Sequence, residues 1–223
     1  MEKHVVKVKS VEFITHNVLK IIIERPPNYN FTPGQATDVT LNKPGWKHKK
    51  NPFTFTSLPE KDYLEFNIKT YPESKGVTNE LLKLKATDEL IIHEVFGAIT
   101  YKGQGVFIAG GAGITPFISI FRFLKSKNLI GDNKLIFANK KKEDIIIEQE
   151  FKDLLGPNFI NILSDERGEG YAYGQITEDF LKSNLSISSK NIYVCGPDPM
   201  IEEVLKLLSN MGIEKSAITI EDI

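Results

Sequence analysis

Apolar and polar residues alternate over short segments in the first hundred residues, which is the pattern of half-buried β-strands. These segments are rich in β-branched residues and lie at residues 5–14, 18–24, 36–41, 54–57, 64–68 and 89–93. Short turns containing Pro, Gly and Asn separate them. Strands at this spacing are typical of a sandwich or a small barrel. We expect one short helix at residues 78–84, capped by Thr78 or Asn79.

The period of the pattern changes after about residue 102. Short apolar runs at 106–109, 135–138, 161–163, 192–195 and 217–220 alternate with amphipathic runs at 116–125, 144–155, 177–181 and 199–210. This alternation predicts βαβ units and a parallel sheet. We therefore expect two domains, an antiparallel β-barrel at residues 1–102 and an α/β domain with a parallel sheet at 103–223.

Composition and charge exclude several classes of protein. The chain of 223 residues carries 28 basic and 29 acidic residues, so binding of nucleic acid through bulk charge is not expected. One cysteine rules out an internal disulfide and an all-cysteine metal site. The four histidines are scattered without metal-ligand spacing, and we expect no metal. No run approaches the length of a membrane span, so we expect a cytoplasmic protein, with its oligomeric state open.

A glycine-rich turn directly follows the first strand of the second half and opens a helix. Its residues that we expect to contact a ligand are Gly110, Gly111, Gly113, Ile114, Thr115 and Pro116. Glycines let the backbone approach a pyrophosphate closely, and a helix N-terminus offers free N–H groups and partial positive charge. The spacing differs from G-x-G-x-x-G, so an ordinary strand-to-helix turn remains the alternative.

Three further segments carry candidate chemistry. Cys195, Gly196 and Pro197 end a predicted strand just before the helix of Met200. Ligands of parallel sheets bind beyond the carboxyl ends of strands, so both glycine turns line one rim. In the first half, residues 51–57 read Asn-Pro-Phe-Thr-Phe-Thr-Ser, and residues 75–79 read Lys-Gly-Val-Thr-Asn at the short helix. Taken singly, a buried cysteine, core aromatics and helix capping are the alternative readings.

Taken together and in this order, these segments resemble the ferredoxin–NADP reductase family, in particular flavodoxin and ferredoxin reductases and the relatives of cytochrome b5 reductase. The resemblance spans nearly the whole chain. It implies an antiparallel flavin-binding barrel followed by a nicotinamide-binding α/β domain. It also implies an enzyme that uses FAD, in preference to FMN, with NADH or NADPH as substrate.

The resemblance assigns roles to individual residues. Those on the flavin side are Asn51, Pro52, Phe53, Thr54, Asn67, Ile68, Lys69, Gly76, Val77 and Thr78. It places Phe53 against the flavin ring, Thr54 near flavin N5 and Thr78 at the pyrophosphate. Cys195 and Glu221 are expected beside the reacting rings, where they shape the geometry without acting as nucleophile or base.

The chain also departs from the family pattern. Asn51 stands where the family has an arginine that grips the pyrophosphate, and the chain lacks the terminal aromatic of plant-type members. Lys49 or Lys50 is a candidate replacement for the arginine. Residues 164–166, Ser-Asp-Glu with Asp165 at the centre, stand where NADPH-preferring members have Ser-Arg, which favours NADH. Arg167 and the lysines at 140–142 are the candidate anchors for a 2′-phosphate in the alternative case.

We therefore expect a flavin-dependent oxidoreductase that takes a hydride from NAD(P)H. Its electrons would pass singly to flavodoxin, ferredoxin or another small carrier. Two alternatives remain at this point. The first is a reductase component of an oxygenase, or a ferric or free-flavin reductase, and the second is a flavin- or nucleotide-binding subunit without turnover.

Overall fold

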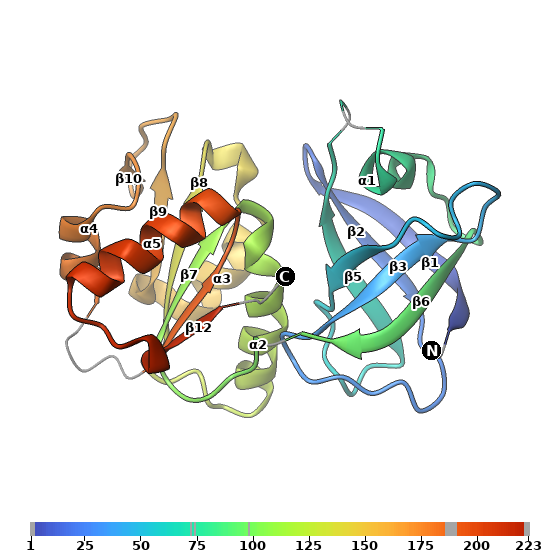
Figure 1. Ribbon diagram of the computed structural model, residues 1–223, viewed down its shortest axis with the longest axis horizontal. Helices are drawn as coiled ribbons and strands as arrows, with labels where there is room; N and C mark the ends of the chain where they lie inside the picture. Colours follow the sequence, from blue (N-terminus) through green and yellow to red (C-terminus); the bar gives the residue numbers. More distant parts are fainter. Residues whose placement is uncertain (1–2, 72, 74, 98, 186–190, 221–223) are drawn as a thin grey trace.

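The computed structural model describes residues 3–71, 73, 75–97, 99–185 and 191–220, which form two domains side by side (Figure 1). The first domain is an antiparallel sheet of six strands in the order β4-β3-β6-β1-β2-β5. Its strands are β1 (His4–Thr15), β2 (Val18–Glu24), β3 (Ala36–Leu41), β4 (Asn51–Thr54), β5 (Tyr63–Lys69) and β6 (Glu89–Phe96). A bridge between Phe55 and Phe66 joins the two ends of the sheet, which closes it into a barrel.

The barrel core follows from the alternation of side chains along its strands. On β5, Leu64, Phe66 and Ile68 point into the core, while Glu65 and Asn67 point outward. Phe55 packs against Phe66, with ring centroids 5.3 Å apart. One short helix, α1 (Val77–Glu80), continues as a 3-10 turn at Leu81–Lys83.

The second domain is a parallel sheet of six strands in the order β10-β9-β8-β7-β11-β12. Its strands are β7 (Val106–Gly110), β8 (Lys134–Asn139), β9 (Phe159–Leu163), β10 (Ala172–Tyr173), β11 (Ile192–Cys195) and β12 (Ile218–Ile220). Its helices are α2 (Thr115–Ser126), α3 (Glu148–Leu155), α4 (Glu178–Asn184) and α5 (Asp198–Asn210). The antiparallel barrel and the parallel sheet together confirm the expected fold class.

Helices cover both faces of the parallel sheet. Apolar residues of α2 and α3 pack on one face, against alternate residues of the strands such as Phe107 and Phe137. Residues of α4 and α5 pack on the other face, against the intervening residues such as Ile108 and Ile136. This two-sided burial explains why the strands of this half read as continuous apolar runs.

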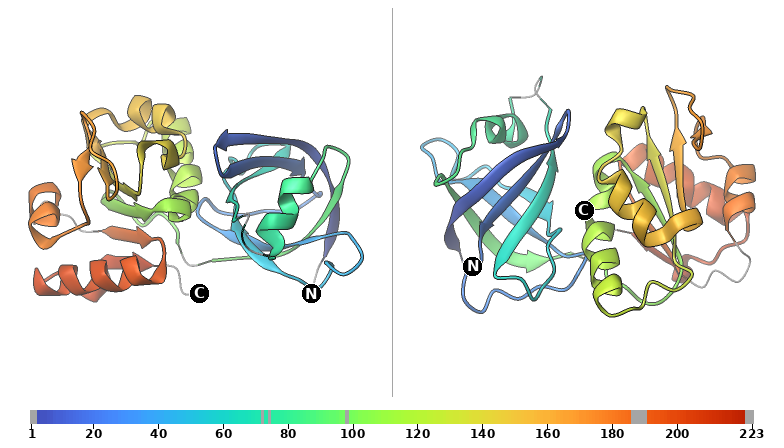
Figure 2. Two further views of the ribbon diagram at one scale, coloured as in Figure 1. Left: turned by 90° about the horizontal axis from the view of Figure 1, so that it is seen from above. Right: turned by 180° about the vertical axis from the view of Figure 1, so that it is seen from behind.

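The helix α2 stands between the parallel sheet and the barrel (Figures 1 and 2). Two barrel residues, Val18 and Ile99, are fully buried in the same apolar cluster as α2. The backbone N–H of Gly34 donates to Ser119 Oγ on α2 at 2.9 Å. The two domains are thus packed against each other through apolar and polar contacts.

Several elements differ from the sequence prediction. The strand expected at residues 54–57 is β4, which ends at Thr54, because the chain then leaves β3 and Phe55 meets Phe66 on β5. Pro52 is tolerated there because β4 is an edge strand of the sheet.

The helix expected from residue 144 begins only at Glu148. Ile147 has a left-handed backbone with φ of 45°, and the two isoleucines before it are buried in the core. At the other short helix, the cap is Gly76, without the side-chain cap expected from Thr78 or Asn79.

We expect the stability of the barrel to fall as the pH is lowered through about 6.5. The ring nitrogens of His93 on β6 are buried without a hydrogen-bond partner among the described residues, and burial followed by the charge of Lys50 lowers its pKa. The folded state therefore binds fewer protons than the unfolded state below the ordinary histidine pKa. Thermal unfolding at pH 7.5 and 5.5 measures this dependence, which His93→Leu should flatten.

The exposed His48 supplies the matched control for this measurement, since His48→Gln should leave the pH dependence unchanged. An equally steep loss of stability in His93→Leu would contradict the prediction.

Candidate functional site

A cavity of about 460 Å³ lies where the barrel meets the α/β domain. The barrel side is lined by Ala36, Pro52, Phe53, Thr54, Asn67, Ile68, Lys69, Tyr71, Thr78, Phe96 and Gly97. The α/β side is lined by Gly110, Gly111, Ala112, Gly113, Thr115, Cys195, Gly196 and Pro197. Segments more than a hundred residues apart in sequence therefore share one cavity, of a size usual for ligand sites.

The wall on the barrel side is built from the ends of β4 and β5. On one edge, β5 pairs with β2 along its whole length. On its other edge, the described pairing stops near Phe66, where Phe55 and the backbone N–H of Thr56 bond to β5. The backbone of β5 beyond Phe66 is therefore open to a ligand that offers donors and acceptors.

Asn67 provides a direct test of whether a polar ligand fits this wall. The residue is only 5% exposed, and neither its amide nitrogen nor its amide oxygen has a hydrogen-bond partner among the described residues. A buried amide without partners costs free energy, of the order of 1–3 kcal/mol. The half-exposed rings of Tyr71 and Phe96 flank the same cavity. These groups fit a flat ring system with polar edges, such as a flavin.

Glycine is required on the α/β side because two turns touch there. A Cβ atom on Gly113 would lie 2.3 Å from the carbonyl oxygen of Cys195 and 2.5 Å from the backbone nitrogen of Gly196. A Cβ atom on Gly110 would lie 2.4 Å from Met200 Sδ. The turn after β7 and the turn after β11 are thus packed backbone to backbone at the carboxyl end of the parallel sheet.

A second cavity of about 590 Å³ continues from the first along this end of the sheet. The two cavities share Lys69, Gly110, Gly111 and Pro197. The second is also lined by the ends of β8 and β9 and by the first turn of α5. Asn139, at the end of β8, lines it with an amide that is buried and has no partner among the described residues. The joined cavities fit an elongated ligand such as a dinucleotide.

The remaining candidate residues do not line the cavity between the two domains. Val77, Ile114 and Pro116 are buried and are not among the lining residues, and Met200 lines the second cavity. Asn51 pairs with Val39 on β3. Asn51 and Gly76 are not among the lining residues of either cavity.

Asp165 lines a separate open groove beside the second cavity. The expected role of Glu221 falls outside the described residues. Neither candidate substitute for the family arginine reaches the cavity lining, because Lys49 lies over the ring of Trp46 and Lys50 pairs with Asp38.

Sequence reasoning missed four lining residues, which are Ala36, Tyr71, Phe96 and Gly97. Gly97 had a usable signal, because a glycine directly after a strand is typical of a backbone turn, and its φ is 118°. Tyr71 and Phe96 had none, since an aromatic at a strand end is more often part of a core.

Within the described part of the chain, no group of three or more His, Cys, Asp or Glu side chains is placed to hold a metal ion. The same residues include no helix that has the length and apolarity to cross a lipid bilayer.

The sequence matches two known protein families. Residues 3–142, more than half of the chain, match the family described as FAD-binding domain. Residues 107–206 match the family described as Oxidoreductase NAD-binding domain. The chain belongs to the ferredoxin–NADP reductase family. The predicted resemblance is thereby confirmed.

Curated relatives in this family are reductases. The reductase component of propane 2-monooxygenase from Rhodococcus jostii is 26% identical over 231 residues, covering 95% of this chain and 61% of the relative. The chain therefore spans about three fifths of that protein. NADH-cytochrome b5 reductase 1 from Aspergillus oryzae is 29% identical over 226 residues, covering 91% of this chain and 77% of the relative.

Solved structures share the two-domain fold. A ferredoxin NADP+ reductase from Neisseria gonorrhoeae with bound FAD and NADP superimposes with a TM-score of 0.85 at 19% identity, covering 99% of this chain and 98% of that one. The cytochrome b5 reductase domain of Ulva prolifera nitrate reductase gives a TM-score of 0.83 at 20% identity, covering 98% of this chain and 97% of that one. At these identities the likeness concerns the fold.

Proposed function

We propose that the chain is an NAD(P)H-dependent flavoprotein reductase that passes single electrons to a separate carrier such as flavodoxin or ferredoxin. The observation that carries this proposal is the single cavity shared by the strand of Phe53 and Thr54 and by the two glycine turns. Membership of the reductase family and reductase relatives support it.

Bound FAD supplies the chemistry in this proposal, since a flavin accepts a hydride at N5 and gives up electrons one at a time. The protein then has to bind and orient. The open edge of β5 and the amide of Asn67 offer hydrogen bonds to the ring edge, and Thr54 lies beside them. Lys69, whose Nζ atom lies 3.8 Å from Asp144 Oδ1, lines both cavities, where its charge would attract the phosphate groups of a bound dinucleotide. The packed turns of Gly113 and Cys195 set the place of the nicotinamide.

Hydride transfer between two stacked rings needs no general acid or base. Accordingly, the described residues that line the cavity between the domains include no His, Asp or Glu. Most of the rate then comes from holding the two rings at reacting distance. Cys195, buried at the end of β11, acts in this proposal through the shape of the turn.

The decisive experiment uses the purified protein. Its flavin is identified after extraction, and the absorbance of the flavin is followed anaerobically on addition of NADH or NADPH. We expect a yellow protein that bleaches. A colourless protein that takes up neither FAD nor FMN would refute the proposal, and a yellow protein that neither nucleotide bleaches would favour a binding subunit without turnover.

The proposal has two versions, which differ in whether a small electron carrier or an oxygenase accepts the electrons. The similarity to a monooxygenase reductase component favours an oxygenase as a second candidate acceptor. Adding flavodoxin, ferredoxin, an oxygenase component, ferric chelates or free flavin to the reduced sample, one at a time, distinguishes these acceptors by their rates of reoxidation.

We infer a preference for NADH from the groove beside the second cavity. The Asp165 carboxylate accepts a hydrogen bond from Ser164 Oγ at 2.5 Å, and Glu166 accepts one from the backbone N–H of Lys142 at 2.8 Å. Arg167 is stacked on Tyr173, with its Cζ atom 3.9 Å from the ring centroid. Four acidic residues line this groove against the two lysines Lys141 and Lys142, so its net charge disfavours a 2′-phosphate and suits a free ribose hydroxyl.

We therefore expect kcat/KM to be higher for NADH than for NADPH. Asp165→Ser should shift the ratio toward NADPH by about fivefold, because removing one like charge near a phosphate in water is worth about 1 kcal/mol. Steady-state titrations at matched ionic strength measure this ratio, since salt screens such a contact. The exposed Glu169 gives the control Glu169→Ser. A tenfold preference of the unaltered protein for NADPH would overturn the assignment.

A further inference from the structure

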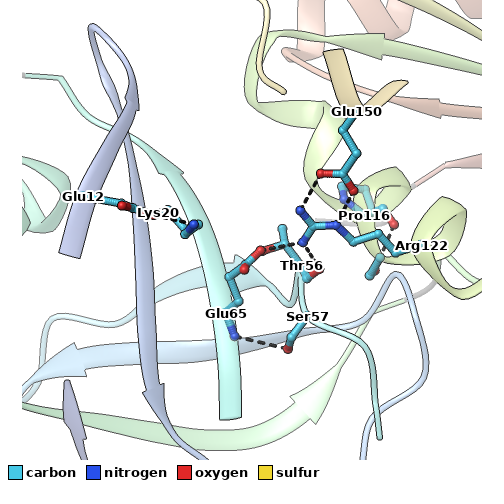
Figure 3. Close-up of polar contacts among 9 residues, drawn as sticks. Glu12, Lys20, Thr56, Ser57, Glu65, Pro116, Arg122 and Glu150 are labelled. Carbon is cyan, nitrogen blue, oxygen red and sulfur yellow. Dashed lines mark hydrogen bonds and ion pairs between the residues drawn. The ribbon is translucent and has the colours of Figure 1, made fainter. Parts of the chain in front are cut away.

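The side chain of Arg122, on α2, is bonded on both sides of the domain boundary (Figure 3). Its Nε and Nη2 atoms donate to the two carboxylate oxygens of Glu150 at 2.6 and 2.8 Å. Its Nη1 atom donates to Glu65 Oε1 at 2.6 Å and to the carbonyl oxygen of Thr56 at 2.8 Å. Glu150 lies on α3, whereas Glu65 and Thr56 lie in the barrel. One guanidinium thus joins the two domains.

Each of these partners lies next to a wall of the cavity. Thr56 follows Thr54 by two residues, and Glu65 precedes Asn67 by two residues on the same outward face of β5. Both Thr54 and Asn67 line the cavity. On the other side, α2 begins directly after the glycine turn of residues 111–114. Arg122 therefore connects the helix that follows the nucleotide turn with the strands that form the flavin wall.

The ion pair between Arg122 and Glu65 is largely buried, and its geometry is fixed by further hydrogen bonds. The side chain of Glu65 is 7% exposed and that of Arg122 is 22% exposed. Thr56 Oγ1 also donates to Glu65 Oε1 at 2.8 Å, which fixes the carboxylate from the barrel side. A buried carboxylate needs its partner, because an unpaired charge there is costly. The planar fork of arginine reaches four acceptor oxygens on three residues in this way, whereas lysine carries a compact charge.

We propose that Arg122 is a positioning residue that sets the distance between nicotinamide and flavin by holding α2 against β5 and the segment after β4. This inference rests on the proposed function, because it concerns the geometry of hydride transfer. Arg122 itself is not among the residues that line the cavity. A displacement of about 1 Å between two reacting groups slows a reaction by roughly 100-fold, so a small loosening of this contact has a measurable effect.

The domains have other contacts that keep them together without Arg122. Val18 and Ile99 stay buried against α2, and Gly34 still bonds to Ser119. We therefore expect an Arg122 variant to fold and to bind flavin. Its defect should lie in the alignment of the two domains and not in their integrity.

The test compares Arg122→Met, Arg122→Lys, Glu65→Gln and the double variant Arg122→Met with Glu65→Gln, each purified with its flavin. Lys125→Met, at the exposed end of the same helix, is the control. Anaerobic stopped-flow reduction over a range of NADH and NADPH concentrations separates the limiting rate of flavin reduction from the apparent Kd of the nucleotide. The long-wavelength absorbance of the stacked rings reports their contact.

We expect Arg122→Met to retain a full complement of flavin, to lose at least tenfold in limiting rate and to change the apparent Kd less than threefold. The absorbance of the stacked rings should weaken, and Arg122→Lys should recover part of the rate. The double variant should be no slower than Arg122→Met, because both changes break the same contact. Glu65→Gln keeps the shape of the side chain and carries the test if Arg122→Met does not fold.

The outcomes separate this inference from the proposed function. An unaltered protein whose flavin neither nucleotide reduces refutes the proposed function. When the unaltered protein is active, a wild-type limiting rate in flavin-loaded Arg122→Met and Glu65→Gln overturns the positioning role. A defect confined to the apparent Kd, or a loss of rate that only follows the loss of flavin, overturns it as well.

Discussion

Gly113→Ala is expected to slow reduction of the bound flavin by NAD(P)H about 100-fold while the flavin content stays normal. The added methyl group would lie 2.3 Å from the Cys195 carbonyl oxygen and 2.4 Å from its carbonyl carbon. These are backbone atoms, so no side chain can rotate away. The two turns must separate by about 1 Å to reach ordinary contact distance, and a displacement of that size costs about 100-fold in rate.

Anaerobic reduction at saturating NADH or NADPH measures this loss. Gly212→Asn is a suitable control, because Gly212 lies past the end of α5 with φ of 78° and no neighbour within 4 Å of an added Cβ atom. Asparagine tolerates this backbone conformation, so the control should keep the wild-type rate. A wild-type rate in Gly113→Ala would mean that the contact between the turns does not place the nicotinamide.

The sequence predicted the fold because both domains obey simple periodicities. In the barrel, one face of each strand is buried, and β2 and β3 have the bounds expected from their alternation. In the α/β domain, strands buried on both faces appear as short apolar runs between amphipathic helices.

The late start of α3 was not predictable from this pattern. The run Ile145-Ile146-Ile147 suits a helix face as well as a buried loop, and only tertiary packing decides between them.

The candidate site was predictable where backbone geometry dictates the residue type. Glycines at 110 and 113 stand out because any side chain there would collide with Met200 or with Cys195. No comparable sequence pattern predicts the two-residue strand β10 or the exposed rings of Tyr71 and Phe96. The same is true of the Arg122 contact, because its partners lie 28, 57 and 66 residues away along the chain. Such contacts depend on how two domains pack.

Thr78→Ala is expected to weaken flavin binding by roughly 10- to 150-fold. Thr78 lines the cavity at the start of α1, and the family resemblance places its side chain at the pyrophosphate. A hydrogen bond to a charged group contributes about 1.5–3 kcal/mol, which converts to that range of Kd. The loss should be large here because Lys49 and Lys50 are engaged by Trp46 and Asp38 and do not line the cavity.

Fluorescence titration of the flavin-free protein with FAD measures the Kd in this experiment. Thr78→Ser keeps the hydroxyl and should bind nearly as tightly as the unaltered protein, whereas Asn79→Ala changes the neighbouring helical residue and should have little effect. Repeating the titration with FMN tests the choice of flavin, because both flavins carry a phosphate but only FAD carries the second phosphate and the adenosine. Equal affinities of Thr78→Ala and the unaltered protein for FAD would show that the pyrophosphate lies elsewhere, with Lys69, which lines both cavities and lies 3.8 Å from Asp144, as the next candidate.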